Sequence, residues 1–446
     1  MRVRFWGTRG SIATPGGSTV HFGGNTLCVE LLTNAGQRLI FDCGTGARAL
    51  GLDLMANAPK PIRGNIMLSH THWDHIQGFP FFTPLFVPGN EFRICAPGGV
   101  GPSLADVLGG QMEYAYFPVE LSQLPAKIAY CELTEGVHEI DGLRVVTQYL
   151  NHPAATLGYR VEADGVAVLY LSDHEPFSET LWRADAKPGS IDAILHAGDR
   201  RHAEFMLGAD LVIHDAQYTP AEYPAKKNWG HSTYQYVVEL AAAAEVRRVA
   251  LIHHDPLHDD AKVREIETLA KALAAEHGKG MQVFCAYEGG DVSVAGAQED
   301  MVSVSVASTV TAPERTMRIL VVDDDANVRL LAQAALSKAY TVVEAEDGEQ
   351  CLTEIQNMVP DLIVLDLKMP KMGGFEVLEK LRAHTAFADI PVLILTAYGD
   401  EGSTRAGFDA GAVDFLTKPF TIPQLNSRVH ACLTRNKVRY GEPGMT

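Results

Sequence analysis

Three histidines and an aspartate lie within six residues of one another, and side chains of these types are common metal ligands. They are His70, His72, Asp74 and His75, in the run SHTHWDH that begins at Ser69. Burying such a group is costly unless a positive charge pairs with it. Imidazole and carboxylate ligands suit Zn²⁺, with Mn²⁺ or Fe²⁺ as alternatives. The cluster therefore predicts a site for one or two divalent ions, and the competing interpretation is a solvated, histidine-rich loop.

The residues before the cluster indicate which part of the fold carries it. The run GNIML at 64–68 is mostly apolar and predicts a buried strand, and Gly78 and Pro80 follow the cluster. The cluster is therefore expected on a loop at the carboxyl end of a strand, where α/β proteins bind their ligands.

Three further candidate ligands end apolar runs elsewhere in the chain. His152 ends the run 145–152, Asp173 ends 168–173, and His253 ends 249–253. Each is expected at one rim of a sheet. His254 directly follows His253 and is the alternative ligand at that position.

Composition limits the class of protein. The chain has 446 residues, which suggests two or three domains, and a formal charge of −18, which argues against a nucleic-acid scaffold with a generally basic surface. Its seven cysteines form no C-x-x-C pair and predict reduced thiols in the cytoplasm. We expect no signal peptide and no membrane-spanning helix, because no sufficiently long apolar run is present.

The histidines are unevenly distributed, which divides the chain. Only two of the 17, His384 and His430, lie beyond residue 300. A stretch rich in small and polar residues separates the two parts and predicts a linker, or alternatively an edge strand. The predicted parts are a metal-binding domain at 1–294, a linker at 295–316, a second domain at 317–436 and a tail at 437–446.

The order of the predicted elements gives a fold class for each domain. In the first domain strands come in a run and then alternate with helices near 103–110, 233–245 and 260–277, which favours two packed sheets with helices outside. In the second, five strands alternate with helices near 326–338, 348–358, 374–384, 401–409 and 422–435, which predicts a doubly wound parallel sheet.

The first domain resembles the metallo-β-lactamase superfamily over about residues 1–294. The resemblance implies an αββα sandwich with two metal ions. One ion would take His70, His72 and His152, the other Asp74, His75 and His253, with Asp173 bridging them. Asp42, in the run FDCGTG at 41–46, would orient a ligand from behind.

Within that superfamily the chain is most similar to the phosphodiesterase branch that includes RNase Z and the carbon–phosphorus-pathway phosphodiesterase. Three segments carry this resemblance: 151–160, Asp215, and the run WGHST at 229–233. By the resemblance, His231 faces the leaving group as general acid, and Asp74 and Asp173 are the catalytic carboxylates. The competing interpretation is that His231 merely precedes the N-cap of the helix near 233–245.

Aromatic residues near the cluster could stack a base, but core packing is the favoured interpretation. They are Phe79, Phe81, Phe82, Tyr114, Tyr116 and Phe117. Arg9 is expected to be solvated at the surface.

The second domain resembles a two-component receiver domain over residues 317–436. Acidic residues follow its first and third strands, at Asp323, Asp324 and Asp366. The resemblance implies that Asp366 accepts a phosphoryl group and that the three aspartates, with the carbonyl of Lys368, hold Mg²⁺. Thr396, Phe415 and Lys418 would be the residues that respond to phosphorylation.

Together these features predict a cytoplasmic dimetal phosphodiesterase controlled by phosphorylation of Asp366. The implied partners are a sensor histidine kinase or another phosphodonor and a small phosphodiester, such as a cyclic nucleotide or dinucleotide. No membrane partner and no DNA-binding module are expected, and a homodimer is left open. The alternatives are a metal-dependent thioester or lactone hydrolase under the same control, and a non-catalytic binding protein switched by phosphorylation.

Overall fold

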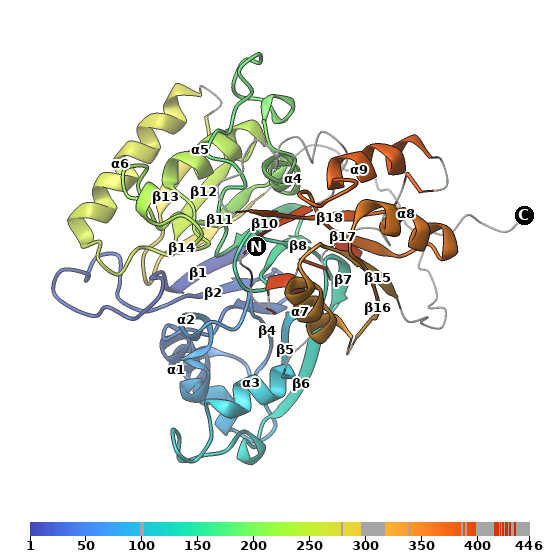
Figure 1. Ribbon diagram of the computed structural model, residues 1–446. Helices are drawn as coiled ribbons and strands as arrows, with labels where there is room; N and C mark the ends of the chain where they lie inside the picture. Colours follow the sequence, from blue (N-terminus) through green and yellow to red (C-terminus); the bar gives the residue numbers. More distant parts are fainter. Residues whose placement is uncertain are drawn as a thin grey trace, which may run out of the picture. The chain divides into compact units, whose positions relative to one another are not determined.

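The structure is a computed structural model, and the chain divides into two compact units, Met1–Gly296 and Ala297–Thr446 (Figure 1). It describes residues 1–98, 102–277, 280–295, 317–337, 339–384, 387–388, 390–397, 414–418, 420, 422, 424–426, 428–429 and 432–433. The helix predicted near 401–409, the tail at 437–446 and all but the first residue of the predicted linker lie outside the described residues.

The first unit contains two seven-stranded sheets, of which one is built mainly from its N-terminal part. Its strands are β1 (Arg2–Gly7), β2 (Cys28–Leu32), β3 (Arg38–Phe41), β4 (Arg63–Met67), β5 (Glu91–Pro97), β6 (Lys127–Leu133) and β14 (Asp291–Ser293). They lie in the order β14-β1-β2-β3-β4-β5-β6. The pairings from β14 to β3 are antiparallel and those from β3 to β6 are parallel. The helices of this half are α1 (Ala47–Asn57), α2 (Trp73–Ile76) and α3 (Leu104–Gly110).

The other sheet is contributed by the second half of the unit. Its strands are β7 (Gly136–Ile140), β8 (Leu143–Tyr149), β9 (Leu157–Ala163), β10 (Val166–Leu171), β11 (Leu211–Asp215), β12 (Arg248–Ile252) and β13 (Gln282–Cys285). They follow in the order β13-β12-β11-β10-β9-β8-β7, and the pairings are parallel from β13 to β10 and antiparallel from β10 to β7. The helices here are α4 (Ala197–Met206), α5 (Tyr234–Ala243) and α6 (Asp260–Glu276).

Aromatic side chains join the inner faces of the two sheets. Phe41 of β3 stacks on Tyr170 of β10 with ring centroids 4.9 Å apart, and Phe5 of β1 meets Phe284 of β13 at 6.4 Å. Helices α1 and α3 cover the outer face of the first sheet, and α4, α5 and α6 that of the second (Figure 1). The predicted αββα sandwich is confirmed.

Five helices and strands of the first unit were not predicted: α1, α2, α4, β7 and β14. Helix α1 has Gly51 at its centre, and glycine lowers helix propensity. A Cβ at this position would lie 2.9 Å from the hydroxyl of Thr83, so the helix packs closely against its neighbour there. This packing, rather than the helix propensity of the sequence, stabilises α1. Helix α4 is polar and begins at a histidine cap, His196, whose ring accepts from the N–H of Gly198. Tertiary packing therefore decides these segments.

The second unit is a parallel sheet. Its elements are β15 (Arg318–Val322), α7 (Ala326–Leu336), β16 (Thr341–Ala345), α8 (Gly348–Asn357), β17 (Leu362–Asp366), α9 (Gly374–Ala383), β18 (Val392–Ala397) and β19 (Asp414–Lys418). The order β16-β15-β17-β18-β19 reverses direction at β15, so the crevice beyond the carboxyl ends of β15 and β17 is the expected ligand site. The predicted doubly wound sheet is confirmed.

Among the described residues, no helix combines the length and the apolar character that a membrane span requires.

Candidate metal centre and phosphorylation site

Most candidate ligands of the first unit lie on loops that follow buried strands, but Asp74 and His75, which were predicted on a loop, lie in the short helix α2. His152, Asp173 and His253 follow β8, β10 and β12 at the same edge of the second sheet, and His70 follows β4 of the first. Asp173 and His253 adopt positive φ angles of 58° and 60°. Such backbone conformations cost non-glycine residues energy and concentrate at functional sites.

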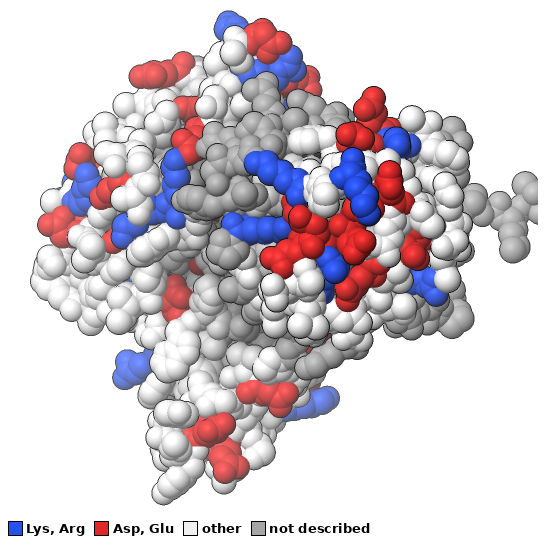
Figure 2. All heavy atoms as spheres, in the orientation of Figure 1, with Lys and Arg blue, Asp and Glu red and all other residues white. Residues whose placement is uncertain are grey.

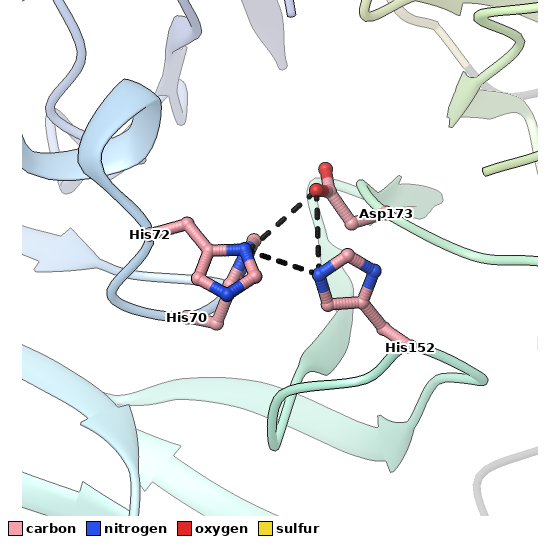
Figure 3. A group of neighbouring side chains, drawn as sticks. All are labelled: His70, His72, His152 and Asp173. Atoms are coloured by element: carbon pink, nitrogen blue, oxygen red, sulfur yellow. Dashed lines mark hydrogen bonds and ion pairs between the residues drawn. The ribbon is translucent and has the colours of Figure 1, made fainter. Parts of the chain in front are cut away.

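Figure 3 shows one cluster, in which three histidines and an aspartate point toward one another. Ligand atoms of His70, His72, His152 and Asp173 all lie within 4.8 Å of one another. Asp173 Oδ2 is 3.7 Å from His70 Nε2 and 3.8 Å from His152 Nε2. His72 is the exposed member of the cluster, so this side of the centre is open to solvent.

A second cluster shares the same aspartate. Asp74, His75 and His253 offer ligand atoms within 4.8 Å of one another. The other carboxylate oxygen of Asp173, Oδ1, lies 3.4 Å from His75 Nε2 and 3.3 Å from His253 Nε2. Each oxygen of Asp173 thus faces a different cluster, which is the geometry of a bridging ligand between two ions.

A buried aspartate orients His75 from behind. Asp42 Oδ2 lies 2.8 Å from His75 Nδ1, and the same carboxylate accepts hydrogen bonds from Tyr170 Oη at 2.6 Å and Ser69 N at 2.7 Å. Since Nδ1–H donates to Asp42, Nε2 of His75 is directed to the cluster as an acceptor. This carboxylate–histidine arrangement is typical of metal sites.

Two other histidines are oriented in the same way by neutral acceptors. His253 Nδ1 lies 2.8 Å from Gln217 Oε1, and His152 Nδ1 lies 3.1 Å from the carbonyl of Gly230. Both acceptors fix the proton on Nδ1 and leave Nε2 available as a metal ligand.

The site residues fit a metal ion chemically. Nε2 of His70 and Nε2 of His75 are buried and have no hydrogen-bond partner among the described residues. An unpaired buried acceptor is costly, and a cation between these nitrogens and the carboxylates would satisfy both.

In the second cluster, the histidines and the carboxylates shift one another's pKa values. Burial alone would lower the pKa of His253, but Asp173 and Asp74 raise it to about 9. Burial would raise the pKa of Asp74, yet His75 and His253 hold it well below its usual range. In the first cluster, burial lowers the pKa of His152 to about 3. The carboxylates therefore stay charged and require positive partners.

The structure separates the two adjacent histidines of the sequence. His253 lies in the second cluster, whereas Nε2 of His254 lies 2.9 Å from the carbonyl of Ala286 and its ring meets Phe22. His254 is therefore directed away from the ligands.

His231 lies beside both clusters. Its Nδ1 is 3.1 Å from Asp215 Oδ2 and 3.9 Å from Asp173 Oδ2, and its ring stacks on His253 with centroids 4.6 Å apart. The N-cap of α5 is Thr233, whose side chain accepts from the N–H of Tyr236. The capping role therefore belongs to Thr233, and His231 faces the metal centre.

Sequence analysis did not predict several residues that hold or orient the candidate ligands. The N–H of Ser11, which has a φ of 62°, donates to Asp74 Oδ2 at 2.7 Å, and Gln217 orients His253. Arg9, expected at the surface, is fully buried and donates to the carbonyls of Gly23 and His258. No motif marks these residues, because their partners lie far away in the sequence.

The predicted aromatic residues divide into two sets. Phe79 and Phe82 are buried in the core that α1 covers, as core packing predicts. Phe81, Tyr114 and Tyr116 are exposed, and Phe81 packs edge-on against Phe117. Core packing is therefore wrong for the exposed set.

In the second unit, an acidic group gathers at the carboxyl ends of β15 and β17. Asp323, Asp324 and Asp366 offer carboxylate oxygens within 4.8 Å of one another. The backbone N–H of Lys368 donates to Asp366 Oδ1 at 3.2 Å, which brings this residue to the same pocket. Figure 2 shows acidic side chains gathered on this unit between α7 and α8, an arrangement that attracts cations.

One lysine joins the acidic residues. Lys418 Nζ lies 2.6 Å from Asp323 Oδ2 and 2.7 Å from Asp366 Oδ2. Burial would lower its pKa, but these carboxylates raise it. Thr396 is buried on β18, and Phe415 on β19 packs beside the core of the sheet.

Comparison with known families agrees with this architecture. Residues 37–254 match the model of the beta-lactamase superfamily domain, and residues 319–430 match the response regulator receiver domain. The chain therefore joins a beta-lactamase superfamily domain to a receiver domain.

This chain matches curated relatives over about a quarter of its length. It is 45% identical over 119 residues to the DNA-binding dual master transcriptional regulator RpaA of Synechocystis, covering 26% of this chain and 49% of that protein. It is 41% identical over 122 residues to the transcriptional regulatory protein PhoP of Bacillus subtilis, covering 27% and 50%. The chain thus spans about half the length of the curated relatives it matches.

Solved structures resemble each domain separately. Human tRNase Z, short form, is 21% identical with a TM-score of 0.44 and covers 66% of this chain and 99% of its own. A diphosphatase of the PhnP family is 18% identical with a TM-score of 0.46 and covers 67% and 99%. The chemotaxis response regulator CheY4 of Vibrio cholerae is 29% identical with a TM-score of 0.26 and covers 27% and 99%.

Proposed function

We propose that the beta-lactamase superfamily domain is a phosphodiesterase that uses two divalent metal ions, and that phosphorylation of Asp366 controls it. The observation that carries the proposal is the buried Asp215–His231 pair beside the two ligand clusters. A phosphodiester with an alkoxide leaving group needs a general acid, whereas a thioester does not. A small cyclic nucleotide or dinucleotide is the expected substrate.

The proposed metal ligands divide between two ions that share one aspartate. They are His70, His72 and His152 for the first ion, Asp74, His75 and His253 for the second, and Asp173 for both. Zn²⁺ suits this donor set, with Mn²⁺ or Fe²⁺ as alternatives. When bound, the two ions would supply a water with a pKa of about 7 and stabilise negative charge on the phosphoryl oxygens.

His231 acts as the general acid. Its Nδ1–H donates to Asp215, so Nε2 is the nitrogen that would carry the transferred proton. As a hydroxide oxygen bonds to phosphorus and the P–O bond to the leaving group breaks, Nε2 gives this proton to the leaving oxygen, so the alcohol departs neutral and His231 becomes neutral.

The two catalytic carboxylates are held by hydrogen bonds from their own neighbourhood. Ser11 N donates to Asp74 Oδ2 at 2.7 Å, and Ser172 Oγ donates to Asp173 Oδ1 at 2.5 Å. These contacts fix the direction of each carboxylate before substrate binds, which lowers the cost of reorganisation during the reaction.

The receiver domain supplies the control. A carboxylate oxygen of Asp366 attacks the phosphorus of a phosphodonor, such as the phosphohistidine of a sensor kinase, and an acyl phosphate forms as the donor's P–N bond breaks. Lys418 already pairs with Asp366 and would balance the added phosphoryl charge. Thr396 would donate to a phosphoryl oxygen, and Phe415 would respond to its movement.

The test is cleavage of bis-(p-nitrophenyl) phosphate by the full chain loaded with Zn²⁺, Mn²⁺ or Fe²⁺, before and after phosphorylation. His70→Ala should abolish cleavage, and His277→Ala, a histidine at the end of α6, is the matched control. Absence of cleavage under all conditions contradicts the proposal. Much faster turnover of thioesters or lactones would assign the alternative hydrolase activity instead.

A further inference from the structure

Trp229 lies two residues before His231, and 57% of its surface is exposed. A single exposed aromatic residue needs no explanation by itself. This one belongs to the loop that lines the metal centre, because the carbonyl of the next residue, Gly230, accepts from His152 Nδ1 at 3.1 Å. The exposed indole therefore belongs to the same loop as His231.

The loop that carries Trp229 is held in place by a buried glutamate. Glu175 accepts hydrogen bonds from the N–H of Asn228 at 2.7 Å and of Gly230 at 2.9 Å, and from Tyr223 Oη at 2.9 Å. Both loop residues have positive φ, 67° for Asn228 and 90° for Gly230. A surface that is already ordered loses little conformational entropy when it binds a ligand.

A positive charge lies next to the indole. Lys226 Nζ is 4.3 Å from the centroid of the Trp229 ring. Lys226 forms no ion pair with any described residue, whereas the adjacent Lys227 pairs with Glu179. The side of the loop that faces Trp229 therefore carries a cation that no carboxylate neutralises.

We propose that Trp229 and Lys226 form a subsite for the leaving group of the substrate, and that this group carries a planar ring and a negative charge. The assignment rests on the proposed function, because the general acid His231 must lie on the leaving-group side of the phosphorus. The indole stacks on the ring, and Lys226 pairs with the charge. A nucleoside phosphate unit combines both features.

The chemistry predicts separable effects for the two side chains. Stacking of a base on an aromatic residue changes affinity by about ten-fold or more when the residue becomes alanine. Loss of a single solvent-exposed charge pair changes affinity by a few-fold. A ligand with a ring but no charge should depend on Trp229 alone, and one with a charge but no ring on Lys226 alone.

The experiment measures equilibrium binding to the metal-loaded full chain of three probes: adenosine 5′-monophosphate, adenosine and ribose 5-phosphate. Trp229→Ala should weaken binding of the two adenosine probes about ten-fold and leave ribose 5-phosphate unchanged, and Trp229→Phe should restore most of the loss. Lys226→Met should weaken the two phosphorylated probes a few-fold. Lys227→Met, next to it on the same loop, should change none of the three.

The proposed subsite is overturned if Trp229→Ala weakens binding of all three probes equally, or if it weakens binding of none. It is also overturned if adenosine 5′-monophosphate does not bind the wild type. Cleavage of bis-(p-nitrophenyl) phosphate by the same preparations tests the proposed function separately. Ring-dependent binding without any cleavage would keep the aromatic site but remove its assignment to a leaving group. Thermal unfolding of each variant checks that the fold is retained.

Discussion

His231 Nδ1 lies 3.1 Å from Asp215 Oδ2, and Asp215 also accepts from the backbone N–H of Ser232 at 3.2 Å. The aspartate therefore orients both the ring and the loop that carries it. Because Asp215 ends β11, this contact ties His231, the proposed general acid, to the second sheet.

Asp215→Asn should lower kcat for phosphodiesters with alkyl leaving groups by about 10- to 100-fold, because the ring of the proposed general acid His231 loses the carboxylate that orients it. The p-nitrophenyl ester should lose much less, since p-nitrophenolate leaves without a proton. Parallel kcat measurements on the two substrate types check this. Asp210→Asn, which removes a carboxylate that pairs with Arg247 at the start of the same strand, is the control. Equal losses on both substrates would assign Asp215 a structural role only.

Asp42→Asn should weaken metal binding by about 10- to 100-fold, because His75 loses the carboxylate that orients it and raises its basicity. Competition with a chromogenic chelator measures the affinity. Asp53→Asn removes a carboxylate that pairs with Arg4 away from the centre, and it should leave metal affinity unchanged. Unaltered affinity in Asp42→Asn would contradict the proposed ligand role of His75.

Gly230→Ala should lower the stability of the protein and its metal content much more than Gly208→Ala does. Both glycines have positive φ, 90° and 63°, so both substitutions add about 1–2 kcal/mol of backbone strain. A Cβ at 230 would lie 2.0 Å from His152 Nδ1, whereas a Cβ at 208 meets nothing within 4 Å. Only Gly230→Ala should therefore also lower metal content, which elemental analysis measures. Equal metal content in the two variants would be the contrary result.

Asp366→Asn should abolish phosphorylation by a small phosphodonor, because the amide cannot form the acyl phosphate. Phosphate-affinity electrophoresis measures the modification. In the wild type, phosphorylation should change the rate of phosphodiester cleavage, and in Asp366→Asn the donor should change nothing. Asp361→Asn, at the amino end of the same strand, is the control. If the phosphodonor still changes the rate of phosphodiester cleavage in Asp366→Asn, the activity is regulated through a residue other than Asp366.

Asp199 on α4 predicts a pH-dependent stability. Burial raises the pKa of this carboxyl to about 7, although it accepts from Phe177 N and from Tyr236 Oη. The folded state then binds the proton more tightly than the unfolded state, so stability falls as pH rises from about 4 to 7 and is level above that. Asp199→Asn mimics the neutral form and should stabilise the protein at pH 8 and not at pH 4. A melting-temperature difference that does not vary with pH would contradict this.

Local sequence determined the residue types and the strand ends of both sites. Four candidate ligands lie within six residues after β4, and the proposed phosphorylation residues lie at the carboxyl ends of strands of a regular α/β pattern. Both neighbourhoods could therefore be predicted without knowledge of distant contacts. The alternation of apolar strands and helices was likewise sufficient for both fold classes, which the structure confirms. Short, Gly-containing or polar helices such as α1 and α4 were not predicted, because packing rather than helix propensity makes these segments helical.

Only the tertiary structure decided how those residues work together. His253 and His254 are equivalent in sequence, and the left-handed backbone at His253 sends one ring to Asp173 and the other to the carbonyl of Ala286. Gln217 and Glu175 gained their roles from partners 36 and 55 residues away. Hydrogen bonds between distant segments leave no periodic trace in a sequence, because each half is compatible with many partners until the sheets bring one of them within reach.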